Sequence, residues 1–299
     1  MQKITPFLWF DHQAEEAVNF YVSLFKNSKV GTIARYNEAA AAATGKPAGS
    51  VMTIGFQLDG NEFTAINGGP AFKFNPSVSL VVLSKNEKEI DDLWKKLIDG
   101  GKVLMELDKY DWSKKYGWLE DKYGLSWQLM ITEDEIKHNI FPSLLFVDKF
   151  YGKADEAIKF YTSVFKNANV ENVFKYGPND KQNKENAVMY GDFVLEGKKF
   201  AAMDGAGKHG FQFNEALSFV VNCDNQEEID YYWNKLTSDG GAESMCGWLK
   251  DKFGVSWQIV PSIIPELLSD EKKAQKVMQA VLQMKKLDIA ELEKAYRGN

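Results

Sequence analysis

The chain has 299 residues, of which 44 % are hydrophobic and 26 % charged, and its formal net charge is -6. This length and balance are typical of a globular protein with two ordinary domains. The acidic character argues against nucleic acid or an anionic membrane as a partner, and no run approaches the roughly 18 apolar residues of a transmembrane helix.

Targeting and cysteine usage favour the cytoplasm. The first ten residues are followed by a polar stretch, so they lack the apolar core of a signal peptide. Cys223 and Cys246 are the only cysteines, and neither belongs to a CxxC pair. A disulfide scaffold or a zinc ribbon is therefore not expected, and we predict a cytoplasmic protein.

The first predicted elements are a strand and a helix. Residues 4–10, ITPFLWF, alternate as in a strand, and Ala17, Phe20, Tyr21 and Leu24 then recur at helical spacing. A hairpin follows over 51–66, because Asp-Gly lies between two alternating runs.

A second set of elements completes the first 131 residues. Residues 77–83 predict another strand, and an apolar stripe from Ile90 to Leu97 predicts a helix that ends before Gly100. The last strand, 125–130, is entered through a turn at Gly124. The order of elements indicates an α+β fold with helices on one face of a curved mixed sheet.

The whole pattern then recurs. Residues 117–128 are GWLEDKYGLSWQ and residues 247–258 are GWLKDKFGVSWQ, with nine of twelve positions identical. The helix motif at Ala14 recurs at Ala154, and the remaining segments follow in register. We therefore predict a tandem duplication, with domains at 1–131 and 138–261 and a helical tail at 262–299.

The motifs AEEAVNFYVSLF, NGGPAFKFNPSVSLVV and GWLEDKYGLSWQ, with their second copies, resemble the PhnB-like group of the glyoxalase/bleomycin-resistance (vicinal oxygen chelate) superfamily. This group carries the label "3-demethylubiquinone-9 3-methyltransferase". The resemblance implies βαβββ modules, two per copy. No glycine-rich loop opens a helix after the first strand, so we interpret the methyltransferase label as a family name without mechanism.

Enzymes of the superfamily hold a divalent metal with His and Glu side chains from facing strands. The positions that match by motif are Thr5 or Phe141 on the first strand, Ser77 or Ala216 on the middle strand, and Gln128 or Gln258 on the last. These side chains are poor metal ligands, so no metal and no other cofactor is predicted. The histidines, His12, His138 and His209, occupy non-equivalent places in the two copies.

Strand alternation defines a hypothetical ligand cavity, which we expect to be aromatic and nearly uncharged. Its candidate binding residues are Thr5, Phe7, Trp9, Ser77, Ser79, Trp112, Ser126, Gln128, Phe141, Ser143 and Gln258. The GWL-x-DK-x-G-x-SWQ motif has two interpretations: a structural turn, or a means of presenting Gln128 and Gln258 to a ligand.

Three functions remain open at this stage. The first is a metal-free module that binds a small hydrophobic or planar molecule. The second is a metal-dependent lyase, isomerase or dioxygenase with atypical ligands. The third is a non-catalytic scaffold with collapsed cavities.

The two copies differ mainly in two loops. Residues 102–116 contain Tyr110, Trp112 and Tyr116 among lysines, whereas the second copy has only AESMC at 242–246. The longer segment is either a lid, which would confine ligand binding to the first copy, or an ordinary edge hairpin. The other difference is an alanine-rich segment, 38–49, which we interpret as a loop.

Assembly and the tail give two further predictions. The duplication is expected to form an intramolecular pseudo-dimer with approximate two-fold symmetry, since single-copy relatives resemble proteins that pair. The tail has an apolar helical stripe, Ala274, Val277, Met278, Val281 and Leu282, and a capping box at Asp288 and Glu291. It either docks on the chain itself or presents a helix to a partner.

Overall fold

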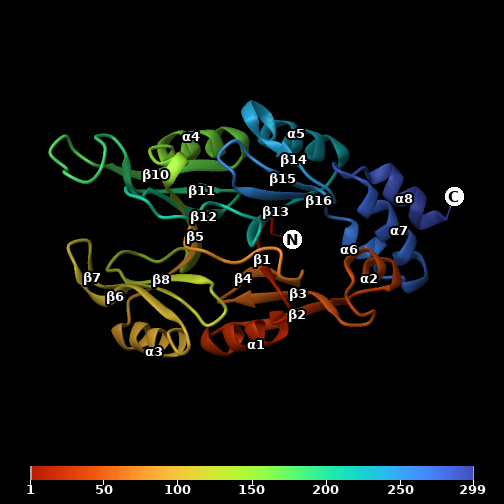
Figure 1. Ribbon diagram of the computed structural model, residues 1–299, viewed down its shortest axis with the longest axis horizontal. Coiled ribbons are helices and arrows are strands. Elements are labelled where there is room, and N and C mark those ends of the chain that lie inside the picture. Colours follow the sequence, from red (N-terminus) through yellow and green to blue (C-terminus); the bar gives the residue numbers. More distant parts are fainter. Residues whose placement is uncertain (1, 299) are drawn as a thin grey trace.

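The computed structural model describes residues 2–298 and contains two eight-stranded sheets with helices packed outside them (Figure 1). The first repeat forms β1 (Ile4–Phe10), α1 (Ala14–Leu24), β2 (Lys29–Arg35), α2 (Glu38–Thr44), β3 (Val51–Leu58), β4 (Asn61–Asn67), β5 (Val78–Ser84), α3 (Glu87–Leu97), β6 (Lys102–Tyr110), β7 (Ser113–Glu120) and β8 (Ser126–Ile131).

The second repeat has the same order of strands, but it lacks a helix between β10 and β11, contains two short 3-10 helices and is shorter at its end. It forms β9 (Ile140–Phe146), η1 (Asp148–Phe150), α4 (Ala154–Val164), β10 (Ala168–Lys175), β11 (Val188–Leu195), β12 (Lys198–Asp204), β13 (Leu217–Cys223), α5 (Gln226–Leu236), η2 (Ser238–Gly240), β14 (Ala242–Glu243), β15 (Trp248–Lys250) and β16 (Ser256–Pro261). The tail adds α6 (Ile264–Leu267), α7 (Glu271–Gln283) and α8 (Ile289–Arg297). None of the helices within 2–298 is long and apolar enough to cross a membrane.

Each sheet combines one half of each repeat. Sheet A has the order β14-β15-β16-β13-β1-β4-β3-β2, and sheet B has the order β10-β11-β12-β9-β5-β8-β7-β6. The repeats join through antiparallel pairing of β1 with β13 and of β5 with β9. These two junctions have the same register, because Phe7 pairs with Ser218 and the equivalent Ser143 pairs with Ser79. Neither sheet is complete without both repeats.

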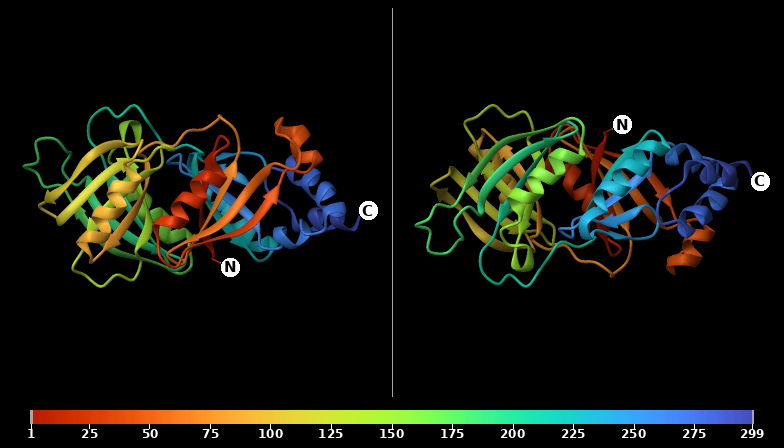
Figure 2. Two further views of the ribbon diagram at one scale, coloured as in Figure 1. Left: turned by 90° about the horizontal axis from the view of Figure 1, so that it is seen from below. Right: turned by 90° about the horizontal axis from the view of Figure 1, so that it is seen from above.

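One helix from each repeat covers the outer face of each sheet. Helices α1 and α5 pack on sheet A, and α3 and α4 pack on sheet B. Figure 1 shows α4 and α5 along the upper side and α1 and α3 along the lower side, with the strands between them. We call the face of each sheet that is turned away from these helices its inner face. Figure 2 shows the same layers from below and above.

Strand alternation assigns the core as the sequence predicts. Ile4, Leu8 and Phe10 of β1 are buried against the helices, within the hydrophobic core that spans both repeats. Thr5, Phe7 and Trp9 therefore lie on the inner face, because side chains alternate across a strand.

The GWL-x-DK-x-G-x-SWQ motif forms a buried junction between a helix and the last strand. In the second repeat, the Asp251 carboxylate accepts hydrogen bonds from Tyr161 Oη at 2.8 Å and Trp257 Nε1 at 2.9 Å. The amides of Phe253 and Val255 donate to its other oxygen at 2.9 and 3.1 Å. Asp121 has the same four kinds of donor in the first repeat. This geometry supports the structural interpretation of the motif's aspartate and second tryptophan.

One prediction about local structure is wrong, and two strands were missed. The alanine-rich segment 38–49 begins with helix α2, whose start is capped by the Asn37 side chain and whose end is Gly45 with φ 70°. Alanine is the best helix former and Asn a favoured N-cap, so five consecutive alanines outweigh the loop interpretation. Strands β2 and β10 were not predicted at all, because both are edge strands with mostly exposed residues and no clear alternation.

The tail docks on the chain itself, which is the first of the two alternatives. Cys246 N and Gly247 N donate to the carbonyls of Met284 and Lys285, both at 2.7 Å, and α7 also contacts α2. Asp288 caps α8 by accepting a hydrogen bond from Glu291 N at 3.0 Å. Since α2 follows β2 and Cys246 follows β14, the tail connects the two opposite edges of sheet A (Figure 1).

Candidate binding sites on the two inner faces

The structure divides the predicted binding residues between two sites. Thr5, Phe7, Trp9 and Gln258 lie on sheet A. The residues on or beside sheet B are Ser77, Ser79, Trp112, Ser126, Gln128, Phe141 and Ser143. The set Thr5, Ser77 and Gln128, which sequence order assigns to one copy, is therefore not one site. The physical reason is the exchange of modules: the first strand of each repeat pairs with the other repeat's second module.

On the middle strand, the predicted Ser77 is not level with Phe141 and Gln128 across the sheet. We call residues that pair side by side across neighbouring strands a row. In sheet B, Val81 pairs with both Phe141 and Gln128, and Gln128 pairs with Trp118. Ser77 lies four residues before Val81, or about 13 Å along the strand. Sheet A has the equivalent row Thr5, Val220, Gln258 and Trp248, so Ala216 is likewise out of register.

These two rows do not fit the metal that the superfamily's enzymes use. Each row offers an amide and otherwise a hydroxyl, aliphatic or aromatic side chains, and none of these substitutes well for imidazole or carboxylate. Throughout residues 2–298 no group of three or more His, Cys, Asp or Glu side chains is arranged to hold a metal ion.

The centre of sheet B's inner face is a cluster of serines. Trp118 Nε1 donates to Ser126 Oγ at 2.7 Å, and Ser126 Oγ donates to Ser79 Oγ at 3.2 Å. Ser143 lies directly opposite Ser79, is 1 % exposed, and its hydroxyl has no hydrogen-bond partner within the described chain. A buried polar group without a partner costs about 1–3 kcal/mol, so this hydroxyl is a marked exception to ordinary packing.

Apolar and aromatic side chains surround the serines. Val81, Phe141 and Ala201 form a small buried cluster against which Leu83 and Tyr190 pack. Tyr116 Oη donates to Gln128 Oε1 at 3.0 Å, and burial raises the pKa of this tyrosine above its usual range. This hydrogen bond fixes the Gln128 side-chain carbonyl and thereby orients the side-chain NH2 group.

Charged groups on this face were missed by the sequence analysis. Lys199 Nζ pairs with Asp192 Oδ2 at 2.7 Å and with Glu171 Oε2 at 2.9 Å, and Asn172 Nδ2 donates to Asp192 Oδ1 at 3.0 Å. Although burial opposes it, the hydrogen bonds that Lys199 donates to these two carboxylates raise its pKa.

The expectation of a nearly uncharged cavity is therefore wrong for sheet B. The positions of Glu171, Asp192 and Lys199 align with Gly31, Gly55 and Glu62 in the first repeat. This divergence between the copies was the available signal. It was not used because β10, which carries Glu171, had not been predicted.

Residues 102–116 form most of the hairpin β6–β7 at the edge of sheet B, which is the second of the two predicted alternatives. Near the turn of the hairpin, Trp112 stacks on Tyr110 with ring centroids 5.0 Å apart and meets Tyr116 edge-on at 5.7 Å. Tyr116 pairs with Met130, so the aromatic cluster borders the inner face. Trp112 is 61 % exposed, and its role in ligand binding stays a prediction.

Sheet A's inner face is filled by its own aromatic rings. Trp248 meets Phe7 edge-on at 5.8 Å and Trp9 at 6.0 Å, and Phe72 packs against Trp9 at 5.0 Å. Phe7 and Trp9 replace Ser143 and Leu145 of sheet B. Because Trp248 points to these rings, its NH does not reach Ser256, whose buried hydroxyl has no partner in the described chain.

Residues 2–130 and 138–260 each match the family model described as 3-demethylubiquinone-9 3-methyltransferase. The chain belongs to this family. Its duplicated architecture is thereby shown over both repeats. No functionally curated protein matches the chain.

Several solved structures are similar to parts or most of the chain. A PhnB protein from Bacillus cereus is 46 % identical, covers 44 % of this chain and 100 % of its own, and gives a TM-score of 0.41. A Staphylococcus aureus protein is 36 % identical over 44 % of this chain and 97 % of its own, with a TM-score of 0.19. Glyoxalase I from Zea mays, at 11 % identity, covers 88 % of this chain and 94 % of its own with a TM-score of 0.57, which shows the glyoxalase-like fold alone.

Proposed function

We propose that the inner face of sheet B binds a small, planar, largely apolar molecule without using a metal. The observation that carries this proposal is the buried Ser143 hydroxyl at the centre of the face, which has no hydrogen-bond partner among the residues that the structure describes. A ligand with one hydrogen-bonding group would satisfy it, while Phe141, Tyr190 and Trp118 would contact the flat surface of the ligand. The charges of Lys199 and Asp192 are already paired with each other.

The inner face of sheet A is assigned a structural role in this proposal. Its aromatic residues Phe7 and Trp9 lie where sheet B has the smaller Ser143 and Leu145, and the tail connects its edges. A methyltransferase activity is not part of the proposal, because β1 leads into α1 without a glycine-rich loop that could hold the cofactor.

The test uses 2-naphthol as a neutral planar probe, titrated by fluorescence. We expect one saturable site per chain and a Ser143→Phe variant, which copies Phe7 at the equivalent position, that no longer binds. Ser143→Ala should weaken binding about threefold to tenfold through the lost hydrogen bond, without loss of stability. Ser256→Ala is the matched control, since it removes the other unpaired buried hydroxyl and should leave binding unchanged.

The same titration tests the hairpin. Trp112→Ala should weaken binding at sheet B, whereas Met245→Ala, at the shorter loop of the second repeat, should not. Equal effects of Ser143→Ala and Ser256→Ala would contradict the proposal. So would elemental analysis that finds about one Zn, Ni, Mn or Fe per chain after desalting.

A further inference from the structure

A cavity of about 400 Å³ lies where the two repeats meet, outside both inner faces. Its wall contains the end of β5, the start of α3, the β3–β4 turn and the linker into β9. Phe25, Leu93 and Ile136 supply apolar surface. The charged residues of the lining are Asp59, Glu89 and Lys85. This volume is within the range of small-molecule sites.

Both carboxylates accept a hydrogen bond from an uncharged side chain. Asp59 accepts a hydrogen bond from the Asn139 side chain, and Glu89 accepts one from Ser84 Oγ. Of the ion pairs formed within residues 2–298, none includes Asp59 or Glu89. Burial, and after it the negative charge of Glu89, raises the pKa of Asp59. The charge of Lys26 lowers this pKa to a lesser extent, and Lys85 also lines the cavity, but neither lysine forms an ion pair with Asp59 or Glu89 within the described chain.

The first half of the molecule here means the cavity region of β5, α3 and the β3–β4 turn, and the second half means the equivalent region of β13, α5 and the β11–β12 turn. The backbone has the same arrangement in both, which identifies the equivalent residues. Leu83 N donates to Asn139 O at 2.8 Å, and Asn222 N donates to Lys3 O at 2.9 Å. Asp59 and Glu196 occupy the same turn, with φ of 45° and 49°. The equivalent residues are Asp59 and Glu196, Glu89 and Glu228, Leu93 and Tyr232, and Asn139 and Lys3.

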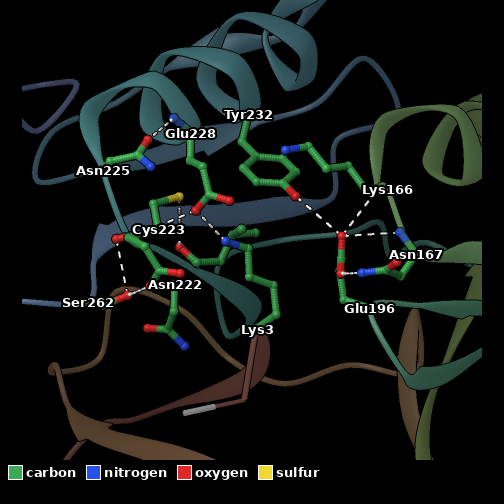
Figure 3. A network of polar contacts seen from close by, with 12 residues as sticks. Lys3, Lys166, Asn167, Glu196, Asn222, Cys223, Asn225, Glu228, Tyr232 and Ser262 are labelled. Carbon is green, nitrogen blue, oxygen red and sulfur yellow. Dashed lines mark hydrogen bonds and ion pairs between the residues drawn. The ribbon is translucent and has the colours of Figure 1, made fainter.

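In that second half the chain fills the equivalent space with its own ammonium and ring (Figure 3). Lys3 Nζ pairs with Glu228 Oε2 at 2.5 Å and lies 5.5 Å from the centre of the Tyr232 ring. Tyr232 Oη donates to Glu196 Oε1 at 3.4 Å. Burial opposes the change, but the bonds from Lys3 and the Asp224 amide lower the pKa of Glu228, so this carboxylate stays ionised.

We propose that the cavity of the first half binds a small primary amine whose ammonium group pairs with Glu89. The substitution of Lys3 by Asn139 removes the cation, and the substitution of Tyr232 by Leu93 removes the ring, while both carboxylates remain. A ligand with an ammonium group and a phenol-sized ring would replace what the chain itself provides in the other half. A polar substituent on the ring would reach Asp59, as Tyr232 Oη reaches Glu196.

The probe is tyramine, which carries an ammonium and a phenol, with 2-(4-hydroxyphenyl)ethanol as its neutral analogue. Calorimetric titration of the full chain near pH 7 should show tyramine binding at least about tenfold tighter than the alcohol, because only the amine forms a charge-assisted bond with Glu89. Glu89→Gln should weaken tyramine binding by at least about tenfold. Glu228→Gln, the same change in the other half, is the matched control and should leave it unchanged.

A double variant provides a second test that does not depend on the folding of Glu89→Gln. Leu93→Tyr with Asn139→Lys transplants the ring and cation of the other half, so it should abolish tyramine binding and raise the melting temperature. The proposal is overturned if neither tyramine, phenethylamine nor butylamine binds at concentrations up to about 10 mM. It is also overturned if the alcohol binds as tightly as tyramine or if the double variant still binds. This site is separate from sheet B's inner face, so either proposal can fail alone.

Discussion

The buried aspartates of the repeated motif are the most constrained single residues of the fold. Asp251 is 3 % exposed, and burial raises its pKa to about 6 although four hydrogen bonds, from Trp257, Tyr161 and two backbone amides, act to lower it. The folded protein therefore holds the proton of this carboxyl more tightly than the unfolded chain, whose Asp pKa is about 3.9.

This shift predicts a direction for the pH dependence of stability. Since the folded pKa is raised, the stabilising contribution of Asp251 is complete below about pH 4 and is lost as the pH rises through about 6. Asp251→Asn should lower the free energy of unfolding by about 2–3 kcal/mol at pH 4 and by less at pH 8. Urea unfolding at several pH values measures this difference.

The control for that measurement is Asp134→Asn, an exposed carboxylate of the linker, which should change the free energy of unfolding by less than about 0.5 kcal/mol at either pH. A penalty for Asp251→Asn that grows with pH would contradict the assignment of a raised pKa.

At the scale of elements, the tail has its own small core. Leu267, Val277, Leu287 and Leu292 are buried together, and Leu287 Cδ1 lies so close to Gly247 that a Cβ there would be 3.2 Å away. Ion pairs from Lys286 to Asp230 and from Lys285 to Glu243 add contacts to the second repeat.

Leu287→Ala should therefore loosen the docked tail. Removal of a large buried side chain costs about 2–4 kcal/mol, and the loss should appear as faster proteolysis between α6 and α7 as well as a lower melting temperature. Lys294→Ala, an exposed change on α8, is the matched control. Unchanged proteolysis and melting in Leu287→Ala would show that the tail contributes nothing to stability.

The elements that could be predicted were those with a buried face. β1, α1, the β3–β4 hairpin, α3 and β8 all show periodic apolar residues, and the repeat doubled the evidence for each. The edge strand β2 has six exposed residues out of seven, so periodicity does not distinguish it from a loop. Helix α2 is stabilised by alanine propensity and by contact with the tail, and neither appears as an apolar stripe.

For the candidate site, the sequence predicted which face of a strand each residue lies on, but not which residues come together in one site. The facing directions of Phe7, Phe141 and Ser143 followed from alternation, because that depends only on local geometry. The pairing partner of each strand could not be predicted in this way. Pairing across the repeats joins distant parts of the chain, and the alternation within one strand does not reveal it. The groups that distinguish sheet B, Asp192 and Lys199, therefore remained outside the prediction.

At the scale of the whole molecule, the central strands β1 and β5 of the first repeat pair with β13 and β9 of the second repeat. Neither repeat can fill these central edges with its own strands in this arrangement. A fragment of residues 1–136 has β1 and β5, and these could pair with β5 and β1 of a second fragment in the same register as β13 and β9. We expect the fragment to form a two-chain dimer in sedimentation experiments, because alone it leaves both central edges unpaired. A folded, monomeric fragment would contradict this.

The pairing of strands from different repeats also determines when sheet A can form during synthesis of the chain. Leu8 pairs with Leu217, so β1 acquires this partner strand only after more than two hundred further residues have been synthesised. At about 5–20 residues per second this wait is on the order of ten seconds or more. Sheet A can therefore be completed only after most of both repeats has been synthesised, and until then the central edge of β1 lacks its partner β13.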